Sequence, residues 1–481
     1  MKLFGWRLVV VSSVMAGALA LHAETRPQYG GALHVAMRAT PTSLDPVELA
    51  AEVDPAGNVL TDSFGRRSVA RLMFDTLVIT DESGRIQPSL ATSWQALPGN
   101  QPGSQRWQFR IRGGVKFNDG TGLTAEIAAA ALRTANPSWN VSVSLDGNSI
   151  VIEHGSSDAD LLEELALPRN SIAKRSSGNT PSGTGPFHMV DWQPGKKLTL
   201  AAEEDCWRGR PFLDTIEIEM GKTFRDQMTA LELSKADLVE VAPEQARRIS
   251  QNQVSGNSVL RGRRVANSAP LELLALVFAR DAASQDEKLL REALALSVER
   301  GSIKNVLLQG AGQPAASILP NWMSGYGFLF PTDPDLPRAR QMCGQVRTVP
   351  TWTVGYDGSD PGARLMAERI ALNAKDAGLS LQPTSSSTPS VDLRLVRIPL
   401  VSPEPWIALR NVARLVGAPA KESGPVEDLH ASELAVLATR RLIPLFHLPV
   451  SYAASANLNH WAVRADGSWD IGNAWLGMGR P

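Results

Sequence analysis

The chain has 481 residues, of which 43% are hydrophobic, so it is long enough for two cores and apolar enough to be globular. Lys and Arg number 48 against 49 Asp and Glu, which gives a net charge of −1. This balance argues against nucleic-acid binding and against polybasic attachment to a membrane.

The first 23 residues have the pattern of an export signal. Lys2 and Arg7 precede an uncharged, mostly apolar run over residues 8–21, which is shorter than the ~20 apolar residues that a membrane span needs. Small residues allow cleavage after Ala20 or after Ala23, of which Ala23 is preferred, and an uncleaved anchor is the alternative. No cysteine follows the run to carry a lipid. We therefore expect a soluble periplasmic protein without a lipid anchor.

A strand is predicted at residues 32–37, followed by a short loop in which Thr42 and Ser43 lie between two prolines. A helix is expected to end within residues 68–76. Residues 107–126 then alternate apolar and polar side chains, starting with Trp107 and Phe109, and two glycine turns follow. Thr124 is expected to cap a helix that begins at residue 125.

A short helix is predicted at residues 161–167, closed by Pro168 and Arg169. Residues 182–187 (S-G-T-G-P-F) form a glycine loop before a strand. No Lys-Ser/Thr pair follows these glycines, so they do not predict a phosphate-binding loop.

The second half of the chain begins with a buried type of strand at residues 271–278. The periodicity of residues 287–299 predicts an amphipathic helix, with Glu287, Arg291 and Arg300 towards water. Residues 351–356, 363–377 and 391–398 predict strand, helix and strand, as in a βαβ unit. A return strand is expected at residues 443–447, and residues 461–476 should rejoin the first part of the fold. Residues 384–390 and 416–428 are expected to be loops.

Signatures of catalysis and of metal binding are missing from the sequence. Neither G-x-S-x-G, nor H-E-x-x-H, nor paired C-x-x-C occurs, and no two of the seven histidines have ligand spacing. We expect no cofactor, no bound metal and no enzymatic activity. Cys206 and Cys343 are too few for a disulfide framework, and we expect both to be structural thiols.

Several of these segments together resemble one protein family. Residues 107–126 are similar to W-T-F-x-L-R-x-G-V-K-F-H-D-G-x-P-L-T-A-E, residues 183–187 match G-T-G-P-F, and residues 205–214 are similar to D-x-Y-W-x-G-x-P-x-L-D with Cys206 in place of an aromatic residue. These motifs are typical of family 5 extracytoplasmic solute-binding proteins, the peptide and nickel-chelate binding subunits of ABC importers.

The resemblance implies an α/β, two-lobed periplasmic binding protein fold with a hinge-bounded ligand cleft. We expect lobe one at residues 24–269, lobe two at 270–450 and a return to lobe one at 451–481. The implied function is capture of an oligopeptide, an organic carboxylate or a metal chelate. The implied partner is an ABC permease in the inner membrane, to which the protein docks transiently as a monomer.

The resemblance also suggests ligand-binding residues. Peptide binders of the family place an Asp before an acidic-Pro dipeptide to hold the peptide amino group, whereas this chain has only Glu404, at the acidic-Pro position itself. Arg169 matches an Arg that contacts chelator carboxylates in nickel-chelate members, which suits the fixed fork of a guanidinium. A solvated Arg169 is the alternative. The histidine that holds metal in those members has no match at residues 407–429.

Further candidates are Arg397, on a strand expected to face the cleft, and Trp406 and Trp139 as stacking walls, with core packing as the alternative for both. The loop with Thr42 and Ser43 corresponds to the mouth of the family's cleft. Two other functions stay open at this point. One is a ligand carrier or sensor of the same fold without an importer, and the other is a secreted hydrolase.

Overall fold

A computed structural model describes residues 26–51, 60, 62–81, 84–98, 105–154, 161–176, 180–254, 262–385, 390–419, 421, 424 and 426–477. The predicted signal at residues 1–23 lies outside these ranges. Among the described residues, no helix combines the length and the apolar composition of a membrane span.

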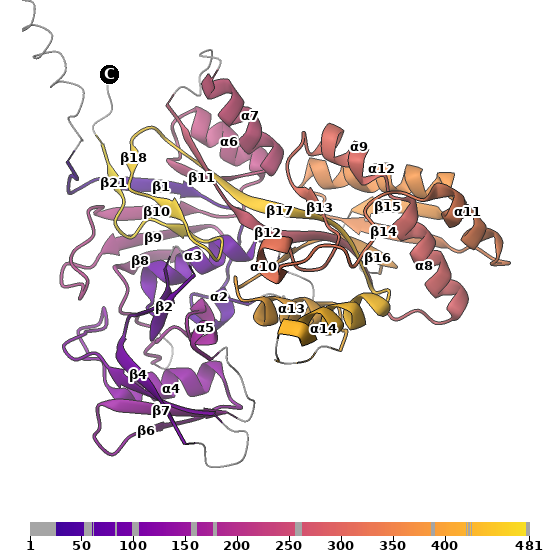
Figure 1. Ribbon diagram of the computed structural model, residues 1–481. Coiled ribbons are helices and arrows are strands. Elements are labelled where there is room, and N and C mark those ends of the chain that lie inside the picture. Colours follow the sequence, from indigo (N-terminus) through magenta and orange to yellow (C-terminus); the bar gives the residue numbers. More distant parts are fainter. Residues whose placement is uncertain are drawn as a thin grey trace, which may run out of the picture.

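One sheet of eleven strands runs through the whole molecule (Figure 1). Its order is β15 (Ser380–Ser385), β14 (Thr351–Tyr356), β16 (Leu393–Pro399), β12 (Arg264–Phe278), β17 (Leu442–Ala454), β11 (Leu238–Val241), β1 (Ala32–Ala36), β10 (Thr215–Glu219), β9 (Lys197–Ala202) and β8 (Phe187–Gln193), with β13 (Gln313–Pro314) paired to β17.

The long strands β12 and β17 join the two sides of this sheet. The start of β12 pairs with the end of β17, which also pairs with β11, whereas residues 272–278 of β12 pair with β16. The register between β12 and β17 shifts on both sides of Pro270. We call the part built around β1 and β8–β11 the first lobe, and the part built around β14–β16 the second lobe. The residue limits predicted for the lobes stay predictions.

The first lobe contains a separate four-stranded sheet at the lower left of Figure 1. Its strands are β4 (Ala91–Leu97), β5 (Gln105–Ile111), β7 (Ser149–His154) and β6 (Asn140–Val143), and α4 (Ala125–Ala135) packs on it. Thr124 caps α4, because its Oγ1 accepts a hydrogen bond from the Ile127 N–H at 3.3 Å. Phe109 and Phe117 are buried, as the alternating pattern predicts.

The other helices of the first lobe flank its sheets. They are α2 (Pro46–Leu49), α3 (Ser63–Met73), α5 (Leu161–Leu165), a 3₁₀ turn at Pro168–Asn170, α6 (Phe224–Glu232) and α7 (Pro243–Val254). Three two-stranded pairs complete the lobe: β2 (Val78–Thr80) with β3 (Ile86–Pro88), β18 (Leu458–Asn459) with β21 (Trp475–Leu476), and β19 (Ala462–Val463) with β20 (Trp469–Asp470). Trp469 and Ile471 pack in the same core as Leu33 and Ile216, so the end of the chain returns to this lobe.

The second lobe carries helices on its sheet and one apolar core. Its helices are α8 (Gln285–Ser297), α9 (Arg300–Ser302), a π-helical turn at Ile303–Leu307, α10 (Asn321–Ser324), α11 (Leu336–Gly344), α12 (Pro361–Asp376), α13 (Pro405–Leu415) and α14 (Val426–Ala438). Helices α13 and α14 lie together below the sheet in Figure 1. Cys206 and Cys343 are both buried and unpaired.

Three expectations for the second lobe are wrong. Arg291 and Arg300 do not face water, since each is 1% exposed. Their guanidinium groups can be buried because they bind backbone carbonyls. Arg291 donates to the carbonyls of Arg280 and Arg440, and Arg300 donates to the carbonyl of Pro444 at 2.8 Å. The other two errors concern predicted loops. Residues 384–390 overlap the strand β15, which extends to Ser385 and pairs with β14, and residues 416–428 overlap helix α14, which begins at Val426.

Candidate functional site

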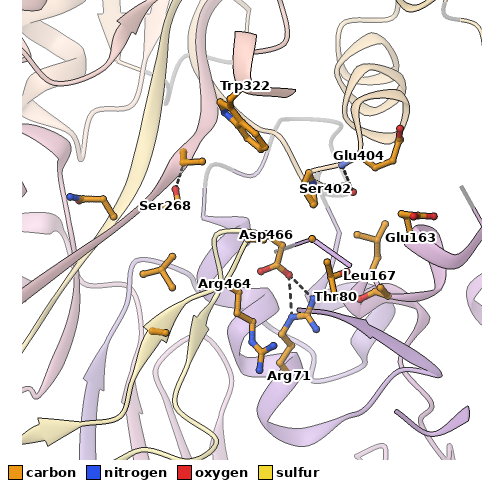
Figure 2. Close-up of a pocket in the computed structure, with 18 residues that line it drawn as sticks. Arg71, Thr80, Glu163, Leu167, Ser268, Trp322, Ser402, Glu404, Arg464 and Asp466 are labelled. Atoms are coloured by element: carbon orange, nitrogen blue, oxygen red, sulfur yellow. Dashed lines mark hydrogen bonds and ion pairs between the residues drawn. The ribbon is translucent and has the colours of Figure 1, made fainter. Parts of the chain in front are cut away.

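A cavity of about 750 Å³ lies between the two lobes (Figure 2). Segments that are far apart in the sequence form its walls. The first lobe contributes α3, the end of α5 and the segment 462–466. The second lobe contributes α10 and residues 402–404. Residues 267–269 of β12 lie between the two sets. The volume falls within the usual range of small-molecule sites.

One wall of the cavity holds a buried ion pair. The Arg71 guanidinium contacts Asp466 Oδ2 through Nη2 at 2.5 Å and through Nε at 3.1 Å, and Ser468 donates its N–H and its hydroxyl to Asp466 Oδ1. Burial raises the pKa of Asp466, but the charge of Arg71 and the hydrogen bonds lower it more, so the pKa lies well below its usual range. The pair therefore forms a polar wall without net charge.

Arg464 lies on the same side of the cavity as this pair (Figure 2). Its Nη2 contacts Asp470 Oδ2 at 2.5 Å. Burial lowers the pKa of Arg464. Both arginines of this wall therefore already have carboxylate partners.

The opposite wall belongs to the second lobe and carries Trp322, Ser402 and Glu404. The Glu404 N–H donates to Ser402 Oγ at 3.1 Å. The Glu404 carboxylate accepts from the Ile407 N–H at 2.7 Å, which makes it the cap of α13, with Pro405 in the first helical position. Glu404 thus lines the cavity, but its acid group stabilises a helix terminus.

Glu163 lies at another edge of the cavity, beside Leu167 in Figure 2. Burial raises the pKa of its carboxyl group. Its Oε2 atom is buried and has no hydrogen-bond partner among the described residues. A side chain of this kind can accept a hydrogen bond from a donor that enters the cavity.

The structure corrects the role expected for Arg169. Its guanidinium binds the Glu164 carboxylate and is not part of the cavity wall. The other oxygen of Glu164 binds Arg410, which belongs to α13 of the second lobe. Arg169 therefore supports a contact between the lobes, which we call the Glu164 bridge, and is not placed to clamp a carboxylate in this cavity.

Two further contacts accompany the Glu164 bridge. Arg67 Nη1 donates to the Val401 carbonyl at 3.0 Å, and Leu167 packs with Val401 and Ile407 in a small buried cluster. The lobes are thus held together by direct contacts as well as by the shared strands.

Arg397 lies in a buried group of charges beside the β12–β17 crossing, which we call the hinge charge cluster. Its guanidinium contacts Glu272 at 3.4 Å and Asp360 at 3.3 Å, and its side chain is 13% exposed. Arg397 lines two small cavities of about 40 and 30 Å³, which are too small for the expected ligands. The members of the cluster are Arg38, Glu240, Glu244, Glu272, Asp357, Asp360 and Arg397.

The remaining predicted residues also lie away from the cavity wall. Trp406 is 5% exposed and packs in the core of the second lobe, so it is not a stacking wall. Trp139 packs against the core of the four-stranded sheet. Ser43 Oγ accepts from the Asp45 N–H at 3.1 Å within its own loop, and the neighbouring Thr42 is exposed.

Sequence reasoning missed Trp322, Arg71 and Asp466. Trp322 lies in the short helix α10, directly after the proline-marked segment at Leu319 and Pro320. Arg71 and Asp466 are separated by 395 positions, and no local pattern links them. No group of three or more His, Cys, Asp or Glu side chains in the described ranges could hold a metal ion.

The hinge charge cluster predicts a pH-dependent stability. Burial raises the pKa of Glu272 above 4.5, despite the opposing charges of Arg397 and Arg38. The folded state then binds more protons than the unfolded state, so the contribution of Glu272 is full below pH 4.5 and is lost as the pH rises through its folded pKa. The stability of Glu272→Gln relative to wild type should therefore increase from pH 5 to pH 8, as measured by urea unfolding.

Glu217→Gln is the matched control for this measurement. The hydrogen bond from Lys197 lowers the pKa of Glu217, so its contribution changes only below about pH 4.5. Its difference from wild type should be constant between pH 5 and pH 8. If the difference in unfolding free energy between Glu272→Gln and wild type is also constant from pH 5 to pH 8, the expected proton uptake on folding is contradicted.

Comparisons with known proteins agree on one family. The pattern of "Bacterial extracellular solute-binding proteins, family 5 Middle" matches residues 85–395. The nickel-binding protein NikA of Staphylococcus aureus is 27% identical over 256 residues, which are 50% of this chain and 49% of that protein. The oligopeptide-binding protein AppA of Bacillus subtilis is 26% identical over 345 residues, 65% of this chain and 57% of that protein.

Solved structures show the same fold. A crystal structure of NikA from Staphylococcus aureus with Ni(L-His)₂ has a TM-score of 0.74 at 19% identity, and covers 92% of this chain and 99% of its own. A dipeptide-binding protein from Pseudoalteromonas in complex with Met-Leu has a TM-score of 0.76 at 15% identity, and covers 93% of this chain and all of its own. These likenesses confirm the two-lobed binding-protein fold.

Proposed function

Because the chain belongs to family 5 of the bacterial extracellular solute-binding proteins, we propose that it is the ligand-capturing subunit of an ABC importer in the periplasm. The cavity of about 750 Å³ between the lobes carries this proposal, since it suits a small solute that touches both lobes at once. Members of the family are binding proteins, so the hydrolase alternative is set aside.

The proposed mechanism is capture, closure and delivery. A ligand in the cavity contacts Arg71 and Asp466 from the first lobe and Trp322 and Ser402 from the second, so it binds the closed arrangement more tightly than an open one. Its differential affinity shifts the population towards the closed state. The Glu164 bridge adds to the stability of that state, and a membrane permease would receive the ligand from it.

The proposed ligands are small peptides, organic carboxylates or metal chelates. One relative is an oligopeptide-binding protein and another a nickel-binding protein, which supports peptides and metal chelates among these classes. A chelate would have to bring its metal already complexed, because no group of three or more His, Cys, Asp or Glu side chains in the described ranges could hold the metal alone.

A cavity-filling variant tests the proposal. Ala269 is exposed and lines the cavity, so Ala269→Trp should place an indole inside it and weaken binding at least about tenfold, which corresponds to about 1.4 kcal/mol. Native mass spectrometry of protein purified from periplasm should show a bound small molecule in the wild type. Titration calorimetry with dipeptides, tripeptides and nickel chelates would measure the affinities.

The control is Ala130→Trp, which adds the same side chain at an exposed position of α4, outside the cavity wall. It should bind like the wild type. Equal binding by Ala269→Trp, or no bound small molecule in any wild-type experiment, would contradict the proposed function.

A further inference from the structure

Trp322 differs from the other tryptophans of this chain in its exposure. Trp6 lies outside the described residues, and of the others Trp322 is the one with an exposed side chain, at 45%. It also lines the cavity between the lobes. A large aromatic side chain that is open to a cavity gives up burial in the core and is typical of a binding surface.

The Trp322 ring is held by one hydrogen bond and by the position of its helix. Its Nε1–H donates to the Pro270 carbonyl at 3.2 Å, which ties the indole to β12 at the point where the pairing register shifts. Its helix α10 starts directly after Pro320, and Ser324 Oγ contacts the carbonyls of Pro320 and Tyr326. A rigid aromatic surface loses little entropy when a ligand stacks on it.

Figure 2 places Trp322 across the cavity from Arg71 and Asp466. These two residues neutralise each other, and Glu404 is bonded to the start of α13. A cation above the indole would therefore find both Asp466 and Glu404 already engaged, and the third carboxyl group of the wall, Glu163, lies at another edge of the cavity with a pKa that burial raises towards the neutral form. A flat ring without charge can stack on the indole while its polar substituents reach Arg71, Asp466 or Ser402.

We infer that Trp322 is the stacking platform of the ligand site and that the ligand carries a planar, π-bonded ring. This inference rests on the proposed function, because it concerns the same cavity. Stacking of aromatic rings contributes about 0.5–1.5 kcal/mol beyond burial of the same area. It therefore selects a planar ring over a saturated group of equal size.

The test compares ligands with and without a planar ring. Ala-Phe is paired with Ala-cyclohexylalanine, and the Ni(II) complex of L-histidine with that of glycine. Titration calorimetry should show that the wild type binds the ring-bearing member of at least one pair about three- to tenfold more tightly. Trp322→Leu should lose this preference, whereas Trp322→Phe should keep most of it and thereby control for folding.

Equal affinity for both members of each pair would overturn the inference, as would a preference that survives in Trp322→Leu. If the wild type binds none of the four compounds, native mass spectrometry after incubation with periplasmic extract decides. A bound molecule without a planar ring overturns the inference but supports the proposed function. A ring-bearing molecule that Trp322→Leu fails to retain supports both, and no bound molecule at all contradicts both.

Discussion

Alanine in place of Gly183 is expected to destabilise the protein by more than about 4 kcal/mol and to leave little folded material. A Cβ at this position would lie 1.8 Å from the Met73 carbonyl oxygen and 2.6 Å from the Phe74 ring. The obstacle is backbone at the end of α3, which cannot rotate away. Soluble yield and thermal unfolding of the purified variant would measure the effect.

Gly122→Ala is the control, because a Cβ there would have no atom within 4 Å. It should unfold within about 0.5 kcal/mol of the wild type, as surface substitutions usually do. A Gly183→Ala variant of ordinary stability would show that the approach of residue 183 to α3 is not required.

The same contacts explain the G-T-G-P-F segment in physical terms. The Gly185 N–H donates to the Met73 carbonyl at 3.0 Å, the Asn118 N–H donates to the Gly183 carbonyl at 2.9 Å, and Thr184 donates to Asp75. The two glycines are needed because α3 approaches so closely. This motif joins the four-stranded sheet, α3 and β8, and it does not contact the ligand cavity.

Replacing Arg397 by methionine is expected to cost about 3–5 kcal/mol, the usual result of breaking a buried ion pair. Methionine would keep much of the volume but would leave Glu272 and Asp360 buried without this counter-charge. Urea unfolding at pH 7 would measure the loss. Adding Glu272→Gln should recover part of it, because the two side chains are in direct contact.

Arg394→Met on the same strand is the matched control, since Arg394 is half-buried like Arg397 but lies outside the hinge charge cluster. Its expected effect is below about 1 kcal/mol. Similar losses for Arg394→Met and Arg397→Met would contradict the view that buried charge, and not side-chain packing on β16, makes Arg397 important.

Much of the fold could be predicted because its signals are local. Alternation over Trp107 and Phe109 gave a strand with a buried face, and the cap at Thr124 gave the start of α4. The strand β15 was missed because it lies at the edge of the sheet and contains Pro383 among polar residues. The burial of Arg291 was missed because the helical periodicity of residues 287–299 predicts that charged side chains face water.

The site was predicted far less well than the fold. Of the seven candidate residues only Glu404 lines the cavity, and its carboxylate caps a helix. Arg71 and Asp466 meet only because the end of the chain returns to the first lobe. Such a contact depends on the tertiary fold, so it cannot be predicted from the spacing of motifs. The same limit applies to the Glu164 bridge, which joins residues 246 positions apart.

The continuous sheet has a mechanical consequence for the proposed closure. The two lobes share hydrogen-bonded strands rather than a free linker, so a relative rotation has to twist β12 and β17 together. The pairing register shifts on both sides of Pro270 and again between Leu274 and Ala275, so the ladder of hydrogen bonds is interrupted there. Because the Trp322 indole donates a hydrogen bond to the Pro270 carbonyl, a twist of the two strands would also tilt the indole ring.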